Sequence, residues 1–418
     1  MPRSDLEVVI VGAGAAGIAA ARRLLDAGVD CLLVEARPRL GGRAWTIVDD
    51  TGLVLDLGCG WLHSADRNPW VEVAEQQGAT IDKSRPPWAR RSPEIGFSHA
   101  EQDEFQQAIG SFFTRLERVR ERQSDIAAAA YLDPYSRWNG LIDALGTYIT
   151  GAEWDRVSAI DFDRYEDTGV NWRLVRGYGT LMSDYGAGLP AMLDCVVRAI
   201  DHGGKRLRID TAKGAIAADQ AIVTIPSALI AAEQPAFTPA LPEKTQAAQG
   251  LPLGLADKLF MALERADEFG DDIRIFGHTD RAATGAYQFR PLGRPVIEAY
   301  FGGSFAADLE AGGDGAFFDF AVSELVGLFG SAFAKRVKPI GLHRWGADPF
   351  ALGSYSYARP GFADCRLKLA EPVDGRLFFA GEACCAGDFS TAHGGWHAGV
   401  RAAEEVIAVR RKRKSDRL

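Results

Sequence analysis

Short apolar runs that end in glycine lie near both ends of this chain. Val8–Val11 contains no polar residue and leads into a Gly-x-Gly-x-x-Gly turn that begins at Gly12. Leu377–Ala380 is a second such run, and Gly381 follows it. Unbroken apolar runs of this length are typical of strands that are buried on both faces of a parallel sheet. The pattern therefore predicts an α/β fold in which both ends of the chain contribute strands to one nucleotide-binding domain.

The glycines after the first run have the spacing of a dinucleotide-binding fingerprint. Gly12 would allow the tight turn, Gly14 the close approach of a pyrophosphate, and Gly17 the packing of the next helix on the sheet. The pyrophosphate would then meet free N–H groups at the helix N-terminus. A second apolar run, Cys31–Val34, is followed by Glu35, where a carboxylate would bind the ribose hydroxyls of an adenosine.

The rest of the pattern predicts an interrupted domain and an insert. Apolar residues recur at helical spacing between Glu101 and Arg122, and we expect the phenylalanines among them to pack into a core. Lys205–Asp210, followed by Gly214, predicts a β-hairpin. We predict a discontinuous, Rossmann-like nucleotide-binding domain and an inserted, mixed α+β substrate-binding domain. Their residues would be 1–75, 175–250 and 345–418 for the first, and 76–174 and 251–344 for the second.

A cationic segment with two glycines follows the first two predicted strands. It contains Ala36, Arg37, Gly41, Gly42 and Arg43, and Arg43 could bind a phosphate in bidentate form. With this segment the chain resembles the flavin-containing amine oxidase family, which includes monoamine oxidases, polyamine oxidases and lysine-specific histone demethylases. Further segments resemble motifs of that family in the same order, namely residues 55–63, 175–181, 196–200, 221–226, 255–259, 345–356 and 391–396.

The resemblance implies that the nucleotide is FAD, and it implies which residues surround it. These are Gly12, Gly14, Ala15, Ala16, Gly17, Glu35, Ala36, Arg37, Gly41, Gly42, Arg43, Gly58, Cys59, Gly60, Trp61, Val197, Thr224, Trp345, Gly381, Glu382, Thr391 and Ala392. Residues 55–63 would run beneath the flavin ring, and the backbone of Val197 would meet the adenine. Monoamine oxidases attach FAD through a cysteine just before an active-site tyrosine. Because Ser354 occupies that position here, we expect FAD to be bound non-covalently.

The resemblance also implies four catalytic side chains. Lys258 would hold a water near the reactive nitrogen of the flavin and assist the reaction with oxygen. Tyr355 and Trp396 would place an aromatic face on each side of the amine. The Trp61-Leu62-His63 segment is similar to a Trp-Ile-His segment of animal polyamine oxidases, and His63 would accept hydrogen bonds from an ammonium group.

These residues together lead us to expect an FAD-dependent amine oxidase. A primary or secondary amine, polyamine-like or another small amine, would be oxidised to an imine by hydride transfer to flavin. The imine would hydrolyse to an aldehyde, and O2 would reoxidise the flavin with release of H2O2. Two other functions stay open. One is an FAD-dependent oxidoreductase of the carotenoid desaturase or protoporphyrinogen oxidase type, and the other is a non-enzymatic binding module stabilised by flavin.

Charge and hydropathy restrict the partners. The net charge is −9, although the segment Arg410–Arg417 is strongly basic. An acidic protein would attract cationic amines weakly. We interpret the basic segment as a solvated helix end rather than a contact for nucleic acid or lipid. No apolar run is long enough to cross a membrane, and the first residues do not form a signal peptide, so we expect a cytoplasmic protein.

Cysteines and histidines add two smaller expectations. The six cysteines show no framework of the kind found in secreted proteins. We expect free thiols at Cys384 and Cys385, with a disulfide between these neighbours as the alternative. His393 and His397 have the spacing of a helical metal-binding pair, but they lie inside the presumed flavin segment, so we expect no metal site.

Overall fold

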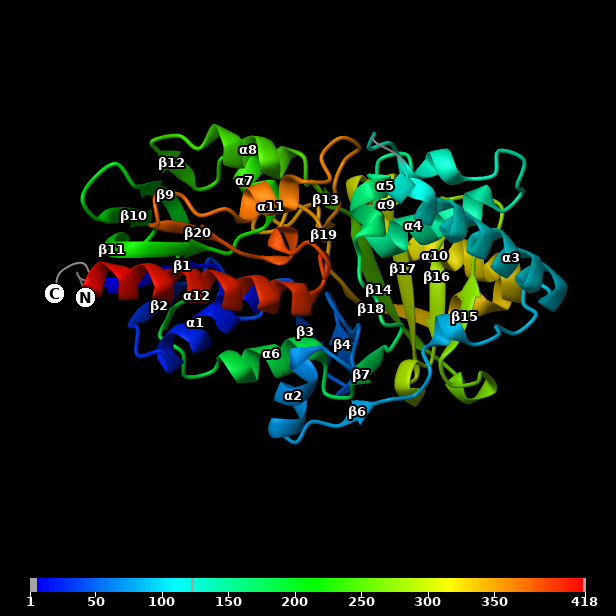
Figure 1. Cartoon of the computed structure of the whole chain (residues 1–418). Coiled ribbons are helices and arrows are strands. Elements are labelled where there is room, and N and C mark those ends of the chain that lie inside the picture. Colours follow the sequence, from blue (N-terminus) through cyan, green and yellow to red (C-terminus); the bar gives the residue numbers. More distant parts are fainter. Residues whose placement is uncertain (1–5, 122–123, 416–418) are drawn as a thin grey trace.

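The larger sheet of the protein takes its strands from three distant parts of the chain (Figure 1). The computed structural model describes residues 6–121 and 124–415. Some of the predictions concern Met1–Asp5, Arg122 and the last residues of the basic segment, which lie outside the described residues. Eight strands form this sheet among the described residues, in the order β12-β9-β10-β11-β1-β2-β8, with β20 beside β11. They are β1 (Leu6–Val11), β2 (Cys31–Val34), β8 (Ala191–Met192), β9 (Val197–Asp201), β10 (Leu207–Thr211), β11 (Gly214–Val223), β12 (Ala236–Thr238) and β20 (Leu377–Phe379).

Strand β11 joins the two ends of the chain. Its second half pairs in parallel with β1 on one side, where Val9 faces Ala221, and with β20 on the other, where Ala221 faces Leu377. Its last three residues, Ala221–Val223, are apolar and buried, as in a strand that is covered on both faces. The first half pairs with β10 in the predicted antiparallel hairpin, with Thr211 opposite Gly214. The α/β prediction and the joining of both chain ends in one sheet are confirmed.

Two long helices lie side by side along this sheet in Figure 1. They are α1 (Ala15–Asp26), which follows the glycine turn, and α12 (Ala392–Ser415). A side chain at Gly399 of α12 would lie 2.2 Å from the carbonyl oxygen of Ala16, so the two backbones are in close contact. Shorter helices complete this half of the molecule: α2 (Pro69–Gln76), α6 (Tyr178–Gly186), α7 (Ser227–Ala231), α8 (Pro242–Gln249) and α11 (Cys365–Ala370).

A second sheet occupies the other half of the molecule (Figure 1). It is antiparallel, in the order β15-β16-β17-β14-β18. Its strands are β14 (Ala256–Leu263), β15 (Ile273–Phe276), β16 (Ala286–Phe289), β17 (Val296–Gly302) and β18 (Val337–Leu342). The helices of this half are α3 (His99–Leu116), α4 (Asn139–Thr150), α5 (Ala159–Asp163), α9 (Gly303–Ala311) and α10 (Asp314–Phe329). These strands come from the segment predicted as 251–344, although the domain boundaries themselves stay a prediction.

Three smaller sheets complete the fold in the described residues. They are β3 (Thr46–Val48) with β4 (Val54–Asp56), β5 (Trp61–Leu62) and β6 (Ile81–Asp82) with β7 (Trp172–Leu174), and β13 (Leu253–Gly254) with β19 (Tyr355–Ser356). Through β5 and β19, the segments that contain His63 and Tyr355 are held where the halves meet. None of the helices in the described residues is both long and apolar enough to cross a membrane.

Helix α3 begins and ends for identifiable reasons. Ser98 caps it, and the Glu101 side chain bonds back to the Ser98 backbone, which completes a capping box. The α-helix ends at Leu116, and a 3-10 turn over Glu117–Glu121 follows, so the helical pattern extends less far as an α-helix than we predicted. Phe112 is fully buried, as expected for a core position.

Candidate functional site

One long cavity of about 1540 Å³ is lined by residues of both sheets. At one end it reaches the glycine turn after β1, Glu35 and Val197. At the other end it reaches Phe105 of α3 and Arg274 of β15. The two segments at opposite ends of the chain, around Gly12 and Gly381, both line it.

The glycine turn leaves room for a phosphate group. Gly12 has φ of +101°, and a side chain at Gly42 would lie 3.1 Å from the Cα of Gly14. Gly14 caps α1 without a side-chain hydrogen bond, so the N–H groups of the first turn are left for another acceptor. An open helix N-terminus that faces a cavity and is approached only by glycine backbone fits the pyrophosphate of a dinucleotide.

Nearly all the residues predicted to surround FAD line this cavity. They are Gly12, Gly14, Ala15, Ala16, Glu35, Ala36, Arg37, Gly41, Gly42, Arg43, Gly58, Cys59, Gly60, Trp61, Val197, Thr224, Trp345, Gly381, Glu382, Thr391 and Ala392. Gly17 does not line it. A side chain there would lie 2.0 Å from the carbonyl oxygen of Gly12, so Gly17 serves the packing of α1 against the turn. The contacts of the individual cavity-lining residues with FAD stay predictions.

The carboxylate of Glu35 is fixed by backbone groups. It accepts hydrogen bonds from the N–H of Ala13 at 2.7 Å and from that of Arg37 at 2.9 Å. Each carboxylate oxygen can accept a further hydrogen bond, so Glu35 can still bind ribose hydroxyls. The charge of Arg37 is instead neutralised within the protein, because its Nη2 lies 2.7 Å from both carboxylate oxygens of Asp348.

Arg43 is oriented by groups from the C-terminal part of the chain. Its Nη1 donates to Glu382 at 2.9 Å and to the carbonyl of Ser354 at 2.7 Å. Glu382 also accepts from Ser356 and from the Ser390 backbone. Burial opposes its ionisation, but Arg43, Ser356 and Arg366 together outweigh burial and lower its pKa. The other guanidinium nitrogens of Arg43 have no hydrogen bond to the described residues, which leaves them for a phosphate.

Lys258 forms a buried ion pair at the junction of the two halves. Its Nζ lies 3.0 Å from a carboxylate oxygen of Glu298 and 3.2 Å from the carbonyl oxygen of Asp56. Burial opposes the charge, but Glu298, Tyr300 and Asp56 together outweigh burial and raise the pKa of Lys258. The residue is therefore a cation and a hydrogen-bond donor rather than a base. An ammonium group has three N–H bonds, so one is left to hold a water in the cavity.

Tyr355 presents its ring to the same part of the cavity with its hydroxyl held from behind. The hydroxyl donates to the carbonyl of Tyr148 at 2.6 Å and lies 3.1 Å from the hydroxyl of Tyr300. The adjacent Ser354 uses its hydroxyl within the protein, because it donates to the carbonyl of Ala256 and accepts from the same residue's N–H.

His63 is held as a neutral imidazole. Its Nδ1 lies 2.6 Å from Oδ1 of Asn171, whose Nδ2 donates to the carbonyl of Gly169. That second bond identifies Oδ1 as the acceptor, so the proton of His63 is on Nδ1 and its Nε2 is an acceptor. Burial lowers the pKa of His63, and the hydrogen bond to Asn171 offsets this only in part. The geometry agrees with the predicted acceptor role.

The position predicted for Trp396 is wrong. Trp396 does not line the cavity but packs against Trp70, with ring centroids 4.9 Å apart, and against Tyr185 at 5.3 Å. In α12 it is Ala392 and Gly395 that line the cavity, and one further residue turns the side chain about 100° away from that face. Before α12 begins, Phe389 supplies an aromatic ring to the cavity, next to Tyr165 at 5.1 Å.

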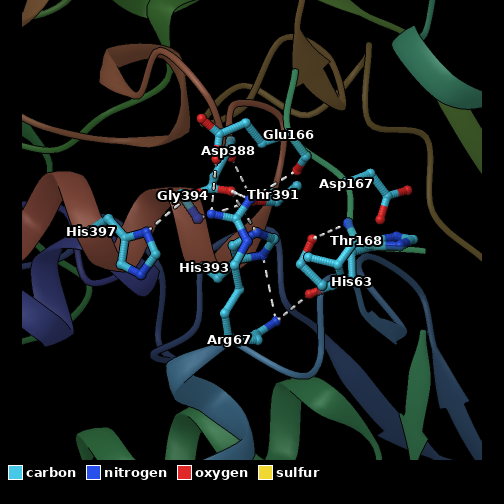
Figure 2. Close-up of polar contacts among 12 residues, drawn as sticks. His63, Arg67, Glu166, Asp167, Thr168, Asp388, Thr391, His393, Gly394 and His397 are labelled. Atoms are coloured by element: carbon cyan, nitrogen blue, oxygen red, sulfur yellow. Dashed lines mark hydrogen bonds and ion pairs between the residues drawn. The ribbon is translucent and has the colours of Figure 1, made fainter. Parts of the chain in front are cut away.

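An ion-pair cluster ties the loop of His63 to α12 (Figure 2). Asp388 accepts from Arg67 at 2.6 Å and from Nδ1 of His397 at 3.0 Å, and it lies 3.3 Å from Nε2 of His393. Burial opposes ionisation of Asp388, but its bonds to the two histidines and its pairing with Arg67 lower its pKa. In the described residues no group of at least three histidine, cysteine, aspartate or glutamate side chains could hold a metal ion. Asp388 instead links the loop that contains Arg67 to α12.

Sequence reasoning missed several residues that line the substrate side of the cavity. Glu298 and Tyr300 of β17 and Arg274 of β15 face it, and so do Phe105 and Phe113 of α3, for which only core packing was expected. In β17 the half-buried Glu298 and Tyr300 alternate with fully buried residues, and a glutamate in such a strand was the available signal. Cys384 and Cys385 carry free thiols, as predicted.

Comparisons with known proteins agree with this geometry. A family model described as flavin containing amine oxidoreductase matches residues 15–90 and 88–407. Polyamine oxidase 3 of Oryza sativa subsp. japonica is 30% identical over 95% of this chain and 88% of its own length. A lysine-specific histone demethylase 1 homolog of the same organism is 29% identical over 97% of this chain and 57% of its own length.

The fold is also shared with a solved structure. A putrescine oxidase bound to putrescine superposes with a TM-score of 0.76 and 18% identity, covering 97% of this chain and 99% of that one. The cofactor that the cavity accommodates is accordingly FAD. By the match over most of its length, this chain belongs to the flavin-containing amine oxidoreductase family.

Proposed function

We propose that this protein oxidises a primary or secondary amine to an imine, which water hydrolyses to an aldehyde, with O2 as the electron acceptor and H2O2 as the product. The observation that carries the proposal is the Lys258–Glu298 ion pair, which lies with Tyr355 and the neutral His63 around one part of the cavity. The similarity to polyamine oxidases supports it. FAD, when bound, supplies the chemistry by accepting a hydride from the carbon next to nitrogen and passing two electrons to oxygen.

The protein must first provide an amine with a free lone pair. Only an unprotonated nitrogen can assist the loss of hydride from its neighbouring carbon. Nε2 of His63 is unprotonated and lines the cavity, so it can take a proton from, or hydrogen-bond to, an incoming ammonium group. Nδ1 keeps its proton and donates it in the hydrogen bond to Asn171. This bond fixes the ring while Nε2 accepts a proton or a hydrogen bond.

Orientation and exclusion of water are the second task. Tyr355 and Phe389 both give aromatic rings to the cavity, and the Tyr355 hydroxyl is fixed from behind. Rings held in this way restrict where the amine can lie and keep bulk water from it. Lys258 remains protonated beside Glu298, so it can hold a water and stabilise negative charge as oxygen is reduced.

The test is the reaction of the purified flavoprotein with hexylamine, N-methylhexylamine and 1,6-diaminohexane. We expect at least one of them to bleach the flavin absorbance without oxygen, and to yield equal amounts of aldehyde and peroxide with oxygen. Tyr355→Ala should slow bleaching, because the amine loses one oriented aromatic face, while FAD stays bound. A flavin that no amine bleaches would overturn the proposal in favour of a different substrate or of a non-enzymatic flavoprotein. Bleaching without peroxide would overturn oxygen as the acceptor.

A further inference from the structure

Arg274 differs from the paired cations of the cavity, Lys258, Arg37 and Arg43. It lies in β15 and lines the cavity, and its side chain has no hydrogen bond or ion pair to any residue in 6–121 or 124–415. Its guanidinium rests over the ring of Phe276, at 4.7 Å from the centroid. Lys258, Arg37 and Arg43 each have a carboxylate within 3.0 Å.

An unpaired guanidinium in this position is a cation without a counter-ion. Burial lowers the pKa of Arg274 to about 10, so it still carries its charge at neutral pH. A charge removed from water is costly unless an opposite charge or several acceptors compensate it. The Arg274 side chain is half-buried and no described side chain provides either, so an acceptor for it would come from a molecule that enters the cavity.

The second sheet sets the distance between Arg274 and the proposed reaction site. Arg274 pairs across the strands with Gln288, and Gln288 pairs with Glu298, the partner of Lys258. Residues opposite each other on neighbouring antiparallel strands share a face, and all three of these line the cavity. The backbones of Arg274 and Glu298 are therefore two strand spacings apart, roughly 10 Å.

The wall beside Arg274 is mostly apolar. Phe276 lies beneath the guanidinium, and Phe105, Ile109 and Tyr148 line the same part of the cavity. Further out, Arg85 and Arg90 add cations, while Arg91 is paired with Asp103. A cationic chain end would meet repulsion here. The acidic net charge of the whole protein is thus a poor guide to this end of the cavity.

We propose that Arg274 binds a carboxylate at the far end of the substrate, so that the preferred substrate is an ω-amino carboxylate with an apolar spacer. This inference rests on the proposed amine oxidation for the amine end only. A planar guanidinium matches a carboxylate in bidentate geometry, and the aromatic wall matches the spacer. The polyamine-like substrate expected from the resemblance would place an ammonium where this carboxylate binds.

The first experiment compares matched chains on the holoenzyme. The series is 6-aminohexanoate with hexylamine and 1,6-diaminohexane, and 8-aminooctanoate with octylamine and 1,8-diaminooctane. We expect kcat/KM, measured by peroxide release and by anaerobic flavin bleaching, to be at least tenfold higher for one of the amino carboxylates than for its matched amine and diamine. Arg274→Gln should remove this preference by about tenfold to a hundredfold, and Arg274→Lys should restore part of it. Arg281→Gln, an exposed arginine paired with Asp280, is the matched control and should keep the preference.

The second experiment does not depend on turnover. Hexanoate and octanoate carry the carboxylate and spacer without the amine, and their binding can be followed by the change in flavin absorbance. We expect Arg274→Gln to weaken this binding at least tenfold, and Arg281→Gln to leave it unchanged. If the acids bind through Arg274 but no amine bleaches the flavin, the carboxylate site is supported and the proposed amine oxidation is wrong. If diamines are preferred in the wild-type protein, or if Arg274→Gln weakens no carboxylate, the inference is wrong.

Discussion

Lys258, Arg37 and Arg43 show how single residues prepare this cavity. Each is a cation with a carboxylate partner that lies far away in the sequence: Glu298, Asp348 and Glu382, respectively. Removing one partner of a buried ion pair typically costs about 3–5 kcal/mol, because the other charge stays buried. These pairs therefore fix side-chain positions firmly, whereas Arg274 is left for a ligand.

For Lys258, the pairing predicts an effect on one half-reaction. Lys258→Met should slow the recovery of flavin absorbance with oxygen by about tenfold or more, because the charge beside the reduced oxygen is lost. Anaerobic bleaching by amine should slow less. Stopped-flow absorbance separates the two, and Lys258→Arg, which keeps the charge, should recover part of the loss. Lys338→Met, an exposed lysine in the neighbouring strand β18, is the control. Equal slowing of both half-reactions would show that Lys258 is structural.

For His63, the lowered pKa predicts the direction of pH dependence. Histidine ordinarily titrates near pH 6.5, and burial shifts His63 below that value, so its imidazole is neutral at pH 7. Acidification through the lowered pKa adds a proton at Nε2, which then cannot accept one from an amine. We expect kcat/KM to fall on the acid side in the wild-type protein, with a flatter acid limb in His63→Asn. An identical acid limb in both proteins would assign it to another group or to the amine alone.

At the scale of elements, α12 shows why the phase of a helix matters. Its first turns lie between the cavity, which Ala392 and Gly395 face, and a core that contains Trp70. Neighbouring residues of a helix point about 100° apart, so Gly395 and Trp396 serve different surfaces. Thr391 and Ala392, which were predicted to contact FAD, both line the cavity, but the sequence motif alone did not show which of its residues face inward.

Trp396→Ala should therefore act on stability rather than on amine orientation. The half-buried Trp396 packs on Trp70 and Tyr185, and its removal should cost about 2–4 kcal/mol, somewhat less than for a fully buried tryptophan. Thermal unfolding should show a lower Tm, while the bleaching rate of the folded holoenzyme changes little. Tyr355→Ala should instead slow bleaching in the folded holoenzyme, in addition to any loss of stability. A Trp396→Ala protein with normal Tm and slow bleaching would show that Trp396 acts in the substrate site.

The parts of the fold that were predictable are those with local signals. The glycine turn at Gly12, the buried run of β1 and the hairpin of β10 and β11 each depend on residues close in sequence. The resemblance to a family added the positions of Lys258 and Tyr355. What was missed depends on juxtaposition: Asp348 neutralises Arg37 across the chain, and cross-strand register alone places Arg274 in line with Glu298. No local pattern contains that register.

At the scale of the whole molecule, the cavity is lined by parts of the chain that lie far apart in the sequence. The N-terminal glycine turn, the Gly381 segment and the second sheet all line it. A ligand that fills such a cavity binds the folded state only, and it stabilises the protein in proportion to the logarithm of its concentration over Kd. FAD binding should accordingly raise the Tm of the whole chain in a concentration-dependent way, in one transition if the two halves unfold together.

The same argument predicts how FAD leaves. Ser354 offers a hydroxyl where thioether attachment would need a thiol, and that hydroxyl is already bonded to Ala256. Acid or heat should therefore release all flavin into the supernatant as free FAD, measurable by fluorescence. Glu35→Ala should weaken FAD retention, because a charge-assisted hydrogen bond to the ribose is worth about 1.5–3 kcal/mol, and Glu7→Ala at the exposed side of β1 should not. Flavin that stays with the precipitated polypeptide would contradict non-covalent binding. Unchanged FAD occupancy in Glu35→Ala would instead show that Glu35 does not bind the ribose. The glycine turn and Arg43 would then be the groups that hold the dinucleotide.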